Sequence, residues 1–490
     1  MQPELQRLKD SLRDHAERQP GRLALWGDEQ RVDYAELWEE VQRREQLLRQ
    51  QGCAVFALAL ENGPEALLWD LAGLFAGSAC VILPPFFSPA QRAHCLRQSG
   101  ASLVLGEAAG MEEELRACGF HADGQFWRLN EPGAAVQLPP GTAKITYTSG
   151  TTGTPKGVCL SAAAMLRVAG ELEAASRATA PQHYLAVLPL AVLLENLGCY
   201  AALLAGATLS LPSQRQLGIQ GASGVDWPRL LGMLMARGAQ SLILVPQLLL
   251  GLVSAIERGA VPASGLRFVA VGGARVADEL LARAARLGLP VYQGYGLSEC
   301  ASVVCLNRPG ANRPGSVGRP LPHVRVRLAE DGEVLVAGPV LLGYLGEPPF
   351  AGEWWPSGDL GEFDADGYLY LRGRKKHQFV TSFGRNVNPE WVEAELTQNG
   401  VLAQAFVHGE GLPHNLALLW PLDPACSDAA IETAVQQANA GLPDYARVGR
   451  WRRLEQPFTP ANGLLTANGR PRRDAILARY RELFHEPQPV

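Results

Sequence analysis

One short stretch of the sequence combines the residue types that bind phosphate. It runs from Tyr147 to Gly157 and reads YTSGTTGTPKG. Glycines let backbone N–H groups approach an anion closely, and serine and threonine hydroxyls add further donors. Lys156 adds a positive charge in a chain that has only five lysines among its 44 lysines and arginines. The spacing differs from the GxxxxGK[ST] pattern of P-loop enzymes, so it predicts a phosphate-binding loop of another kind.

Composition narrows the class of protein that carries this loop. The chain has 490 residues, of which 47% are hydrophobic and 19% charged, so it can bury a large core. Its net charge of -5 argues against a nucleic-acid partner, which would require a basic surface. The nine cysteines include no CxxC pair, so we expect neither a disulfide framework nor a zinc cluster. The charged N-terminus lacks the apolar segment of a signal peptide, and we therefore expect a cytoplasmic location.

The elements that must position the loop alternate along the chain. Short apolar runs of β-forming residues are separated by helical segments, and they lie at 55–60, 80–83, 102–105, 241–245 and 267–271. This alternation predicts βαβ units with parallel sheets. The long uncharged run 238–256 is interrupted by Pro246, so we expect a buried strand followed by a helix, without an integral membrane span.

The pattern changes in the last third of the chain. Between about 315 and 373, short strands are joined by turns such as Asp331-Gly332 and Asp366-Gly367, which predict antiparallel hairpins. A shorter segment follows, with a helix from Pro389. We therefore predict an α/β fold: a large N-terminal domain (1–372) of parallel βαβ sheets with a small β-barrel-like part, then a small, mobile α+β domain (375–490), joined by a hinge near 373–376.

The sequence resembles the adenylate-forming enzymes, which include acyl-CoA synthetases, the adenylation domains of nonribosomal peptide synthetases and firefly luciferase. YTSGTTGTPKG resembles the signature of this family, and residues 74–85 resemble the segment that precedes it. The other matches follow in the family's order: YGLSE at 295–299, GSVGRP at 315–320, SGDLG at 357–361, 373–393, and NGLLTANGRPRR at 462–473. The resemblance implies a ligase that works in two steps. A carboxylate attacks the α-phosphate of ATP with loss of pyrophosphate, and a thiol then displaces AMP from the acyl adenylate.

The resemblance also assigns roles to the residues that bind ATP and Mg²⁺. Lys156 and the loop residues would hold the β- and γ-phosphates; these loop residues are Thr148, Ser149, Gly150, Thr151, Thr152 and Gly153. Ser298 would bind the α-phosphate, and Glu299 would hold Mg²⁺, a hard cation that prefers oxygen ligands. Asp359 would accept hydrogen bonds from the ribose hydroxyls, with Arg374 assisting. The adenine would lie between Tyr295 on one side and Gly273 and Ala274 on the other.

Two further assignments concern the domain movement and the acyl group. By resemblance, Lys375 or Lys376 lies where the family swivels its small domain between the two half-reactions; two surface lysines at a linker would look the same. Val192 stands where many acyl-CoA synthetases have a histidine or an aromatic residue that lines the acyl site. A valine there suggests a more open or more apolar entry, so Val192 is a candidate residue of the acyl pocket.

The sequence departs from the family at one catalytic position. The C-terminal segment normally carries a lysine that reaches the acyl carboxylate and the α-phosphate, whereas this chain has Arg470 there and no lysine after Lys376. Arginine keeps the charge and can bind a phosphate or carboxylate bidentately, but its geometry differs. Three interpretations remain open. Arg470 performs the lysine's role, Arg472 or Arg473 does so, or adenylation is impaired and the chain binds nucleotide without turnover.

The substrate is expected to be an apolar carboxylic acid. Glu195 is the only acidic residue between Tyr184 and Leu211, and it lies in an LLEN context shared with acyl-activating members of the family. An amino acid is therefore disfavoured, whereas a fatty acid is favoured and an aromatic acid remains an alternative. CoA is the expected thiol, and the phosphopantetheine of a separate carrier protein is the alternative acceptor.

Overall fold

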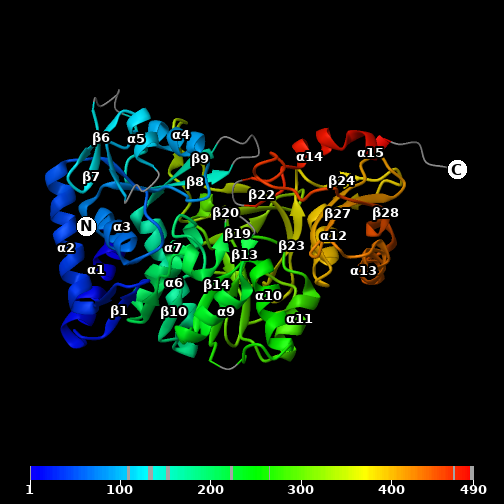
Figure 1. Cartoon of the computed structure of the whole chain (residues 1–490), viewed down its shortest axis with the longest axis horizontal. Coiled ribbons are helices and arrows are strands. Elements are labelled where there is room, and N and C mark those ends of the chain that lie inside the picture. The colour runs from blue at the N-terminus through cyan, green and yellow to red at the C-terminus, as the bar shows by residue number, and fades with distance from the viewer. Residues whose placement is uncertain are drawn as a thin grey trace.

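The computed structural model of the protein describes residues 2–106, 111–130, 136–149, 155–220, 224–263, 265–466 and 469–485. Figure 1 shows a large part that contains the N-terminus and a smaller C-terminal part, coloured orange to red, at one end of the molecule. The predicted α/β class with a separate C-terminal domain is confirmed, as the sheets below show.

The largest sheet has nine strands within the described residues, in the order β18-β17-β16-β15-β14-β10-β11-β1-β2. Neighbouring strands from β16 to β1 are parallel, and β2, β17 and β18 pair antiparallel with their neighbours. The bounds are β1 (Leu23–Trp26), β2 (Arg31–Asp33), β10 (His183–Leu185), β11 (Thr208–Ser210), β14 (Ser241–Leu244), β15 (Phe268–Val271), β16 (Val291–Tyr295), β17 (Cys305–Leu306) and β18 (Arg319–Pro320).

A second sheet carries the strand that leads into the predicted phosphate loop. Its order in the described residues is β21-β9-β8-β4-β3-β5-β7-β6, with parallel pairing from β8 to β5. The bounds are β3 (Val55–Leu58), β4 (Ala79–Ile82), β5 (Leu103–Leu105), β6 (Phe120–Asp123), β7 (Phe126–Leu129), β8 (Thr142–Ser149), β9 (Pro155–Ser161) and β21 (Gly343–Tyr344). A short separate pair is formed by β12 (Ile219–Gln220) and β13 (Gly224–Val225).

Helices pack between and around these two sheets. The main core includes Leu67 and Trp69 of α3, Met165 of α6 and Tyr200 of α7, together with residues of both sheets. The helices are α1 (Pro3–Arg18), α2 (Tyr34–Gln51), α3 (Pro64–Ala76), α4 (Pro89–Ser99), α5 (Glu112–Ala117), α6 (Ala162–Ser176), α7 (Leu193–Leu204), α8 (Gln214–Leu217), α9 (Trp227–Ala236), α10 (Pro246–Glu257) and α11 (Asp278–Arg286), with 3-10 turns η1 (Arg177–Thr179) and η2 (Ser298–Cys300).

The expected strand and helix in 238–256 are present as β14 and α10. Pro246 is the first residue of α10, where a missing N–H leaves no hydrogen bond unmade. In the part of the chain that the structure describes, no helix is long and apolar enough to cross a membrane.

A four-stranded antiparallel sheet forms the half-barrel part of the large domain. Its order is β19-β20-β22-β23, with bounds β19 (Arg325–Leu328), β20 (Glu333–Ala337), β22 (Trp355–Phe363) and β23 (Leu369–Arg374). The two predicted Asp-Gly turns join β19 to β20 and β22 to β23. Gly332 and Gly367 have φ angles of 83° and 80°, a region that favours glycine, which explains why these turns contain it.

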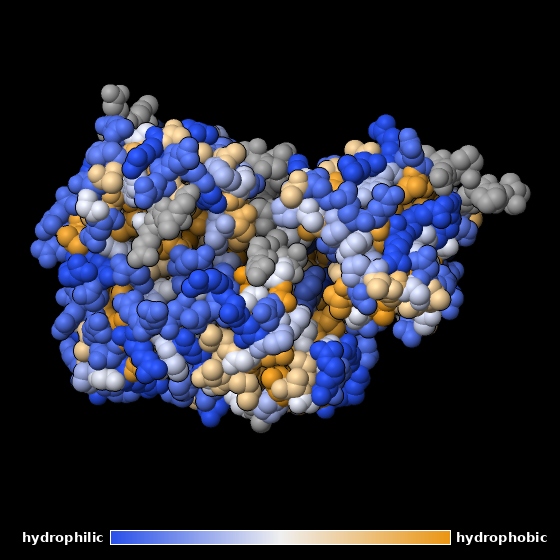
Figure 2. Space-filling model, in the orientation of Figure 1, coloured by the Kyte–Doolittle hydropathy of each residue, from blue (hydrophilic) through white to orange (hydrophobic). Residues whose placement is uncertain are grey.

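The C-terminal domain folds around its own core. Strands β26, β27 and β28 form its sheet, and Val392, Leu396, Ala417 and Ile431 are among the buried residues between this sheet and the helices. The bounds are β24 (Phe379–Val380), β25 (Asn386–Val387), α12 (Pro389–Thr397), β26 (Leu402–His408), β27 (Asn415–Pro421), α13 (Asp428–Ala440), η3 (Asp444–Ala446), β28 (Val448–Arg453), α14 (Arg473–Arg479) and α15 (Arg481–His485). Figure 2 shows this domain as a smaller lobe, with a notch between it and the large lobe.

Candidate active site

Several predicted site residues follow the carboxyl ends of neighbouring parallel strands. Gly273 and Ala274 follow β15, Tyr295 is the last residue of β16, and Val192 lies in the segment after β10. Ligands of open α/β sheets bind at this edge, because loops from adjacent strands converge there. Gly273 has a φ of 82° and lies exposed beside Ala274, so both backbones are accessible from outside the sheet.

Ser298 and Glu299 lie in the turn η2, directly after β16. The two residues that follow η2, Ala301 and Ser302, have φ angles of 50° and 86°, which non-glycine residues rarely adopt. Such strain is common at functional sites, where the surrounding structure holds it. Here the backbone carbonyl of Glu299 accepts a hydrogen bond of 2.6 Å from the Leu341 N–H, which fixes the turn from the other side.

Asp359, on strand β22 of the half-barrel, is the centre of a polar cluster. Its carboxylate accepts the Tyr295 hydroxyl at 2.7 Å and pairs with Arg374 Nε at 2.8 Å. The register of β22 and β23 places Arg374 directly opposite Asp359. Burial raises the pKa of Asp359, and the nearby charges of Arg374 and Arg470 and the Tyr295 hydrogen bond oppose this effect. The structure therefore brings Tyr295, Asp359 and Arg374 together.

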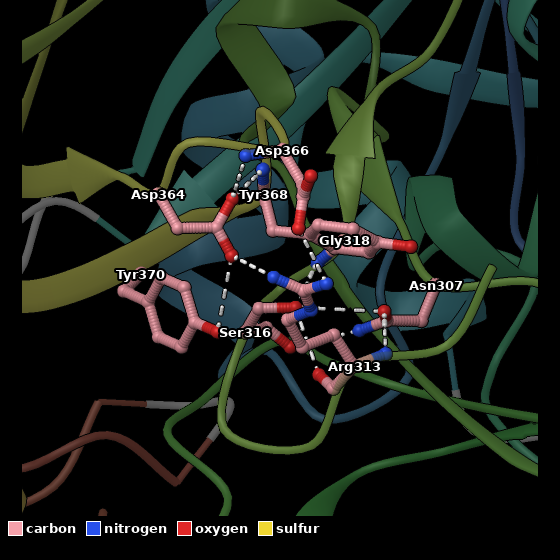
Figure 3. A network of polar contacts seen from close by, with 8 residues as sticks. All are labelled: Asn307, Arg313, Ser316, Gly318, Asp364, Asp366, Tyr368 and Tyr370. Carbon is pink, nitrogen blue, oxygen red and sulfur yellow. Dashed lines mark hydrogen bonds and ion pairs between the residues drawn. The ribbon is translucent and has the colours of Figure 1, made fainter.

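The hairpin that carries Asp359 is anchored at its far end by Arg313, as Figure 3 shows. The Arg313 guanidinium reaches Asp364 at 2.5 Å and Asp366 at 2.8 Å, both in the turn between β22 and β23. Asn307 accepts the Arg313 backbone N–H at 2.9 Å and donates to the Ser316 carbonyl at 2.8 Å. Asn307 follows β17, so the network ties the half-barrel hairpin to the large sheet.

The backbone of the GSVGRP segment lies close to both the half-barrel hairpin and the end of the large sheet. Val317 N–H donates to the Leu369 carbonyl at 2.9 Å, and Leu369 N–H donates to the Gly318 carbonyl at 3.0 Å. Gly318 has a φ of 88°, and an added Cβ would lie 2.1 Å from the Leu306 carbonyl carbon. Only glycine fits there, which gives a structural reason for this motif.

Arg470 of the C-terminal domain reaches across to the large domain. Its Nη2 donates to the Gly273 carbonyl at 3.2 Å, although 197 residues separate the two positions. The side chain still meets solvent, but reduced hydration beside the protein and the charge of Arg374 lower its pKa, while Glu299 and Asp359 oppose the shift. The guanidinium therefore lies within the electrostatic reach of three other predicted site residues.

The neighbouring arginines have partners within their own domain. Arg472 donates to the Gly463 carbonyl at 3.2 Å. Arg473 pairs with Glu393 at 2.8 Å and donates to the Val407 carbonyl at 2.6 Å. Of these three arginines, Arg470 is the one that contacts the large domain in the described structure.

Tyr344, which is not among the predicted site residues, links Lys156 to Glu299. Its hydroxyl donates to Glu299 Oε1 at 2.8 Å, and Lys156 Nζ lies 5.1 Å from the centre of its ring. Tyr344 lies on β21, which pairs with β9 next to Lys156. The Lys156 side chain is about half-exposed, and its Nζ lies 3.4 Å from Glu347 Oε1. A single tyrosine far along the chain has no sequence signal of its own, because only the β21–β9 pairing places it here.

The remaining predicted site residues are distributed as follows. Thr148 lies opposite Lys156 in the β8–β9 register. Gly150, Thr151, Thr152 and Gly153 lie outside the described residues, as does the side chain of Ser149. Lys375 and Lys376 are both exposed, and Lys375 pairs with Asp331 and, at 3.0 Å, with Glu333.

Val192 is partly exposed at the start of α7, where its carbonyl accepts hydrogen bonds from the N–H groups of Glu195 and Asn196. The Glu195 carboxyl group is fully buried, accepts the Tyr184 hydroxyl and accepts the Leu188 N–H at 2.8 Å. Glu195 therefore braces the segment that carries Val192, and neither of its oxygens is left without a partner.

Comparisons with known proteins identify the family of this chain. The AMP-binding enzyme family matches residues 12–345, and the AMP-binding enzyme C-terminal domain matches residues 376–486. The chain is 28% identical over 473 residues to the long-chain-fatty-acid–CoA ligase FadD15 of Mycobacterium bovis (77% of this chain and 76% of the relative). It is 29% identical over 421 residues to the 2-succinylbenzoate–CoA ligase of Bacillus velezensis (80% and 83%).

A solved structure shows the same fold. It is the o-succinylbenzoate coenzyme A synthetase MenE of Bacillus subtilis in complex with ATP and a magnesium ion, with a TM-score of 0.75 and 23% identity over 95% of this chain and 98% of that chain. Because the family match covers more than half of the sequence, the chain belongs to the AMP-binding enzymes of the adenylate-forming superfamily, and it is an AMP-forming acid–thiol ligase by class.

Proposed function

We propose that this protein uses ATP and Mg²⁺ to convert an apolar carboxylic acid into an acyl adenylate and then transfers the acyl group to the thiol of CoA. In the first step a carboxylate oxygen bonds to the α-phosphorus and the bond to the β-phosphate oxygen breaks. In the second step the thiol sulfur, having lost its proton, bonds to the acyl carbon and AMP leaves.

The observation that carries the proposal is the position of Arg470. It extends from the C-terminal domain to the Gly273 carbonyl, and its charge interacts with Glu299, Asp359 and Arg374. A cation at that place can stabilise the negative charge that develops between a carboxylate and a phosphate. This geometry supports the assignment of Arg470, rather than Arg472 or Arg473, to the role of the family's lysine.

The other residues take the roles that the resemblance implies. Asp359 accepts the ribose hydroxyls, with Arg374 beside it, while Tyr295, Gly273 and Ala274 hold the adenine. Lys156, with Thr148 and the phosphate loop, binds the pyrophosphate portion. Ser298 binds the α-phosphate. We further propose that the chain bends at 373–376, between domains 1–372 and 375–490, and that Lys375 or Lys376 acts at this hinge.

Glu299 suits a magnesium ion because its carboxylate is partly exposed at the same edge and offers hard oxygen ligands. Among the described residues, no group of three or more His, Cys, Asp and Glu side chains could hold a metal ion. Glu299 would therefore share Mg²⁺ with phosphate oxygens and water, as is usual for this cation. When bound, the ion would neutralise phosphate charge.

Two further parts of the proposal are the class of carboxylic acid that is activated and the thiol that accepts the acyl group. A fatty acid is our first proposal, since one relative is named a long-chain-fatty-acid–CoA ligase. The 2-succinylbenzoate–CoA ligase relative makes an aromatic acid the second candidate. Both names contain CoA, which favours CoA over the phosphopantetheine of a carrier protein.

Acid-dependent ATP–pyrophosphate exchange tests the proposal. Wild type and Arg470→Lys would be assayed with fatty, aromatic and amino acids, followed by thioester formation with CoA or a carrier protein. We expect exchange in both proteins with an apolar acid, and a CoA thioester from wild type. Exchange in Arg470→Lys alone would place the defect at this arginine. ATP binding without exchange in either protein would instead indicate a nucleotide-binding protein without turnover.

A further inference from the structure

A closed polar network is buried in the core between β8 and two helices. It consists of Asp70 on α3, Lys144 on β8, and Asn196 and Tyr200 on α7, and we call these four residues the Lys144 cluster. Their exposed fractions are 0%, 3%, 1% and 0%. A buried charge is costly unless it is paired and hydrogen-bonded, so the connections within the cluster determine whether it can exist.

Each polar group of the cluster has its partners. Lys144 Nζ donates to Asp70 Oδ1 at 2.7 Å, Asn196 Oδ1 at 2.5 Å and the Tyr200 hydroxyl at 3.2 Å. Asp70 Oδ2 accepts the Asn196 amide at 2.8 Å and the Tyr200 hydroxyl at 2.5 Å. An ammonium group has three N–H donors, and the cluster supplies three acceptors.

This geometry explains a lysine in a chain that otherwise prefers arginine. The sequence has 39 arginines and five lysines. A guanidinium has five N–H donors in a plane, so an arginine at position 144 would leave donors unsatisfied inside the core. Stability alone does not account for the cluster, because well-packed apolar residues often replace a buried ion pair without loss.

The cluster joins the two segments that lead to the proposed substrates. Side chains alternate along a strand, so Lys144, Thr146 and Thr148 share one face of β8, and the phosphate loop begins at Thr148. On the other side, Asn196 and Tyr200 are four residues apart on one face of α7, and α7 begins directly after Val192. The four side chains thus fix the phosphate strand against the helix of the candidate acyl segment.

We propose that the Lys144 cluster is a positioning element, which holds the end of β8 at Thr148 and the acyl segment in register so that the carboxylate meets the α-phosphate. This inference rests on the function proposed above. The residues act through β8 and α7 and do not touch the substrates. Loss of one hydrogen bond of the cluster should therefore slow the adenylation step, while it should lower the unfolding midpoint no more than the loss of another buried hydroxyl does.

Tyr200→Phe tests this proposal, with Tyr34→Phe as the matched control. Tyr34 is also fully buried in the same core, and its hydroxyl donates to the Ala207 carbonyl at 2.8 Å. Both substitutions remove one buried hydroxyl. We expect similar shifts in the unfolding midpoint, a loss of about fivefold or more in kcat for pyrophosphate exchange with Tyr200→Phe, and a change within about twofold with Tyr34→Phe. Equal activities of the two variants would overturn the proposal.

Two further variants examine the mechanism of positioning. Lys144→Arg keeps the charge but not the three-donor geometry, so exchange at the wild-type rate would contradict the geometric argument. If the cluster acts through the phosphate loop, the double variant Tyr200→Phe with Lys156→Gln should lose less exchange rate than the product of the two single losses. Fully independent effects would count against it.

A failure of the proposed function can be told apart from a failure of this inference. Wild-type exchange would be measured first, since its absence concerns the function and not the cluster. In that case the ATP affinity of Tyr200→Phe and Tyr34→Phe, measured by calorimetry, reports on the phosphate loop without turnover. A weaker affinity for Tyr200→Phe alone supports the inference, and equal affinities overturn it.

Discussion

Asp359 depends on neighbours from three separate places in the chain. Tyr295 ends a strand of the large sheet, Arg374 lies opposite on β23, and Arg470 comes from the C-terminal domain. Burial raises the pKa of Asp359, whereas these neighbours favour its charged form. Groups that also surround the proposed nucleotide therefore hold the carboxylate in place and oppose the effect of burial on its pKa.

Removing these contacts should weaken nucleotide binding in a graded way. A hydrogen bond to a charged group contributes about 1.5–3 kcal/mol, so we expect Tyr295→Phe to lower ATP affinity by about tenfold and Asp359→Ala by more. Calorimetry measures both. Tyr292→Phe is the control, because Tyr292 lies on the same strand but stacks on Phe268. An unchanged affinity in Asp359→Ala would show that the ribose assignment is wrong.

The segment between β10 and α7 is held by one buried acid. Glu195 accepts the Tyr184 hydroxyl and the Leu188 N–H, and a Cβ at Gly198 would collide with the Tyr184 hydroxyl. Glycine at 198 therefore lets Tyr184 reach Glu195 across the helix. Burial raises the pKa of Glu195 from 4.5 to about 8, and the hydrogen bonds from Tyr184 and Leu188 oppose this effect. The folded protein therefore keeps the group largely protonated at neutral pH, and in that state the carboxyl O–H can be the donor in the contact with Tyr184.

This pKa predicts a specific dependence of stability on pH. Between pH 4.5 and about 8, the unfolded chain has lost the Glu195 proton and the folded protein retains it. The free energy of unfolding contributed by this group should therefore fall as pH rises, by at most about 1.4 kcal/mol per pH unit, and level off above pH 8. In Glu195→Gln this contribution is absent.

Denaturant unfolding of wild type and Glu195→Gln at pH 5, 6.5 and 8 measures the difference. We expect the variant to gain stability relative to wild type as pH rises. Parallel stability curves for the two proteins would contradict the raised pKa.

At the scale of the whole molecule, side chains and backbone groups of the described residues join the two domains. Arg470 reaches Gly273, and Arg283 donates to the Gln398 carbonyl at 3.2 Å. Near the proposed hinge, Glu333 accepts the Gly358 N–H at 2.9 Å and pairs with Lys375 at 3.0 Å, while the Lys375 N–H donates to the Gly358 carbonyl at 2.9 Å. Glu333 thus ties the hinge to the residue next to Asp359.

If the small domain rotates between the half-reactions, the Lys375 ion pairs stabilise the arrangement that the structure shows. Exposed pairs contribute about 0–1 kcal/mol, so Asp331→Asn with Glu333→Gln should slow pyrophosphate exchange by up to about fivefold. Thioester formation from added acyl adenylate should not slow. The two half-reactions are assayed separately for the variant.

Glu353→Gln is the control for this experiment. It removes an exposed pair with Arg325 of 2.7 Å, next to the same sheet but away from the hinge. An equal loss in both half-reactions of the hinge variant would contradict a role of these pairs in the domain movement.

The sequence by itself determined what depends on neighbouring residues along the chain. Apolar β-forming runs became β3, β4, β5, β14 and β15, the Asp-Gly turns joined the expected hairpins, and Pro246 began a helix, because backbone preferences and periodic burial act locally. The ordered motifs, from the phosphate loop to the C-terminal segment, identified the family.

Tertiary structure alone decided which distant side chains meet. Arg470 at Gly273, Tyr344 between Lys156 and Glu299, and Lys144 with Asp70, Asn196 and Tyr200 are joined by strand register and by the packing of helices between sheets. These contacts span tens to hundreds of residues, so no local pattern encodes them. Each forms only once the hydrophobic faces of separate elements have packed together, which is the physical reason that the sequence did not reveal them.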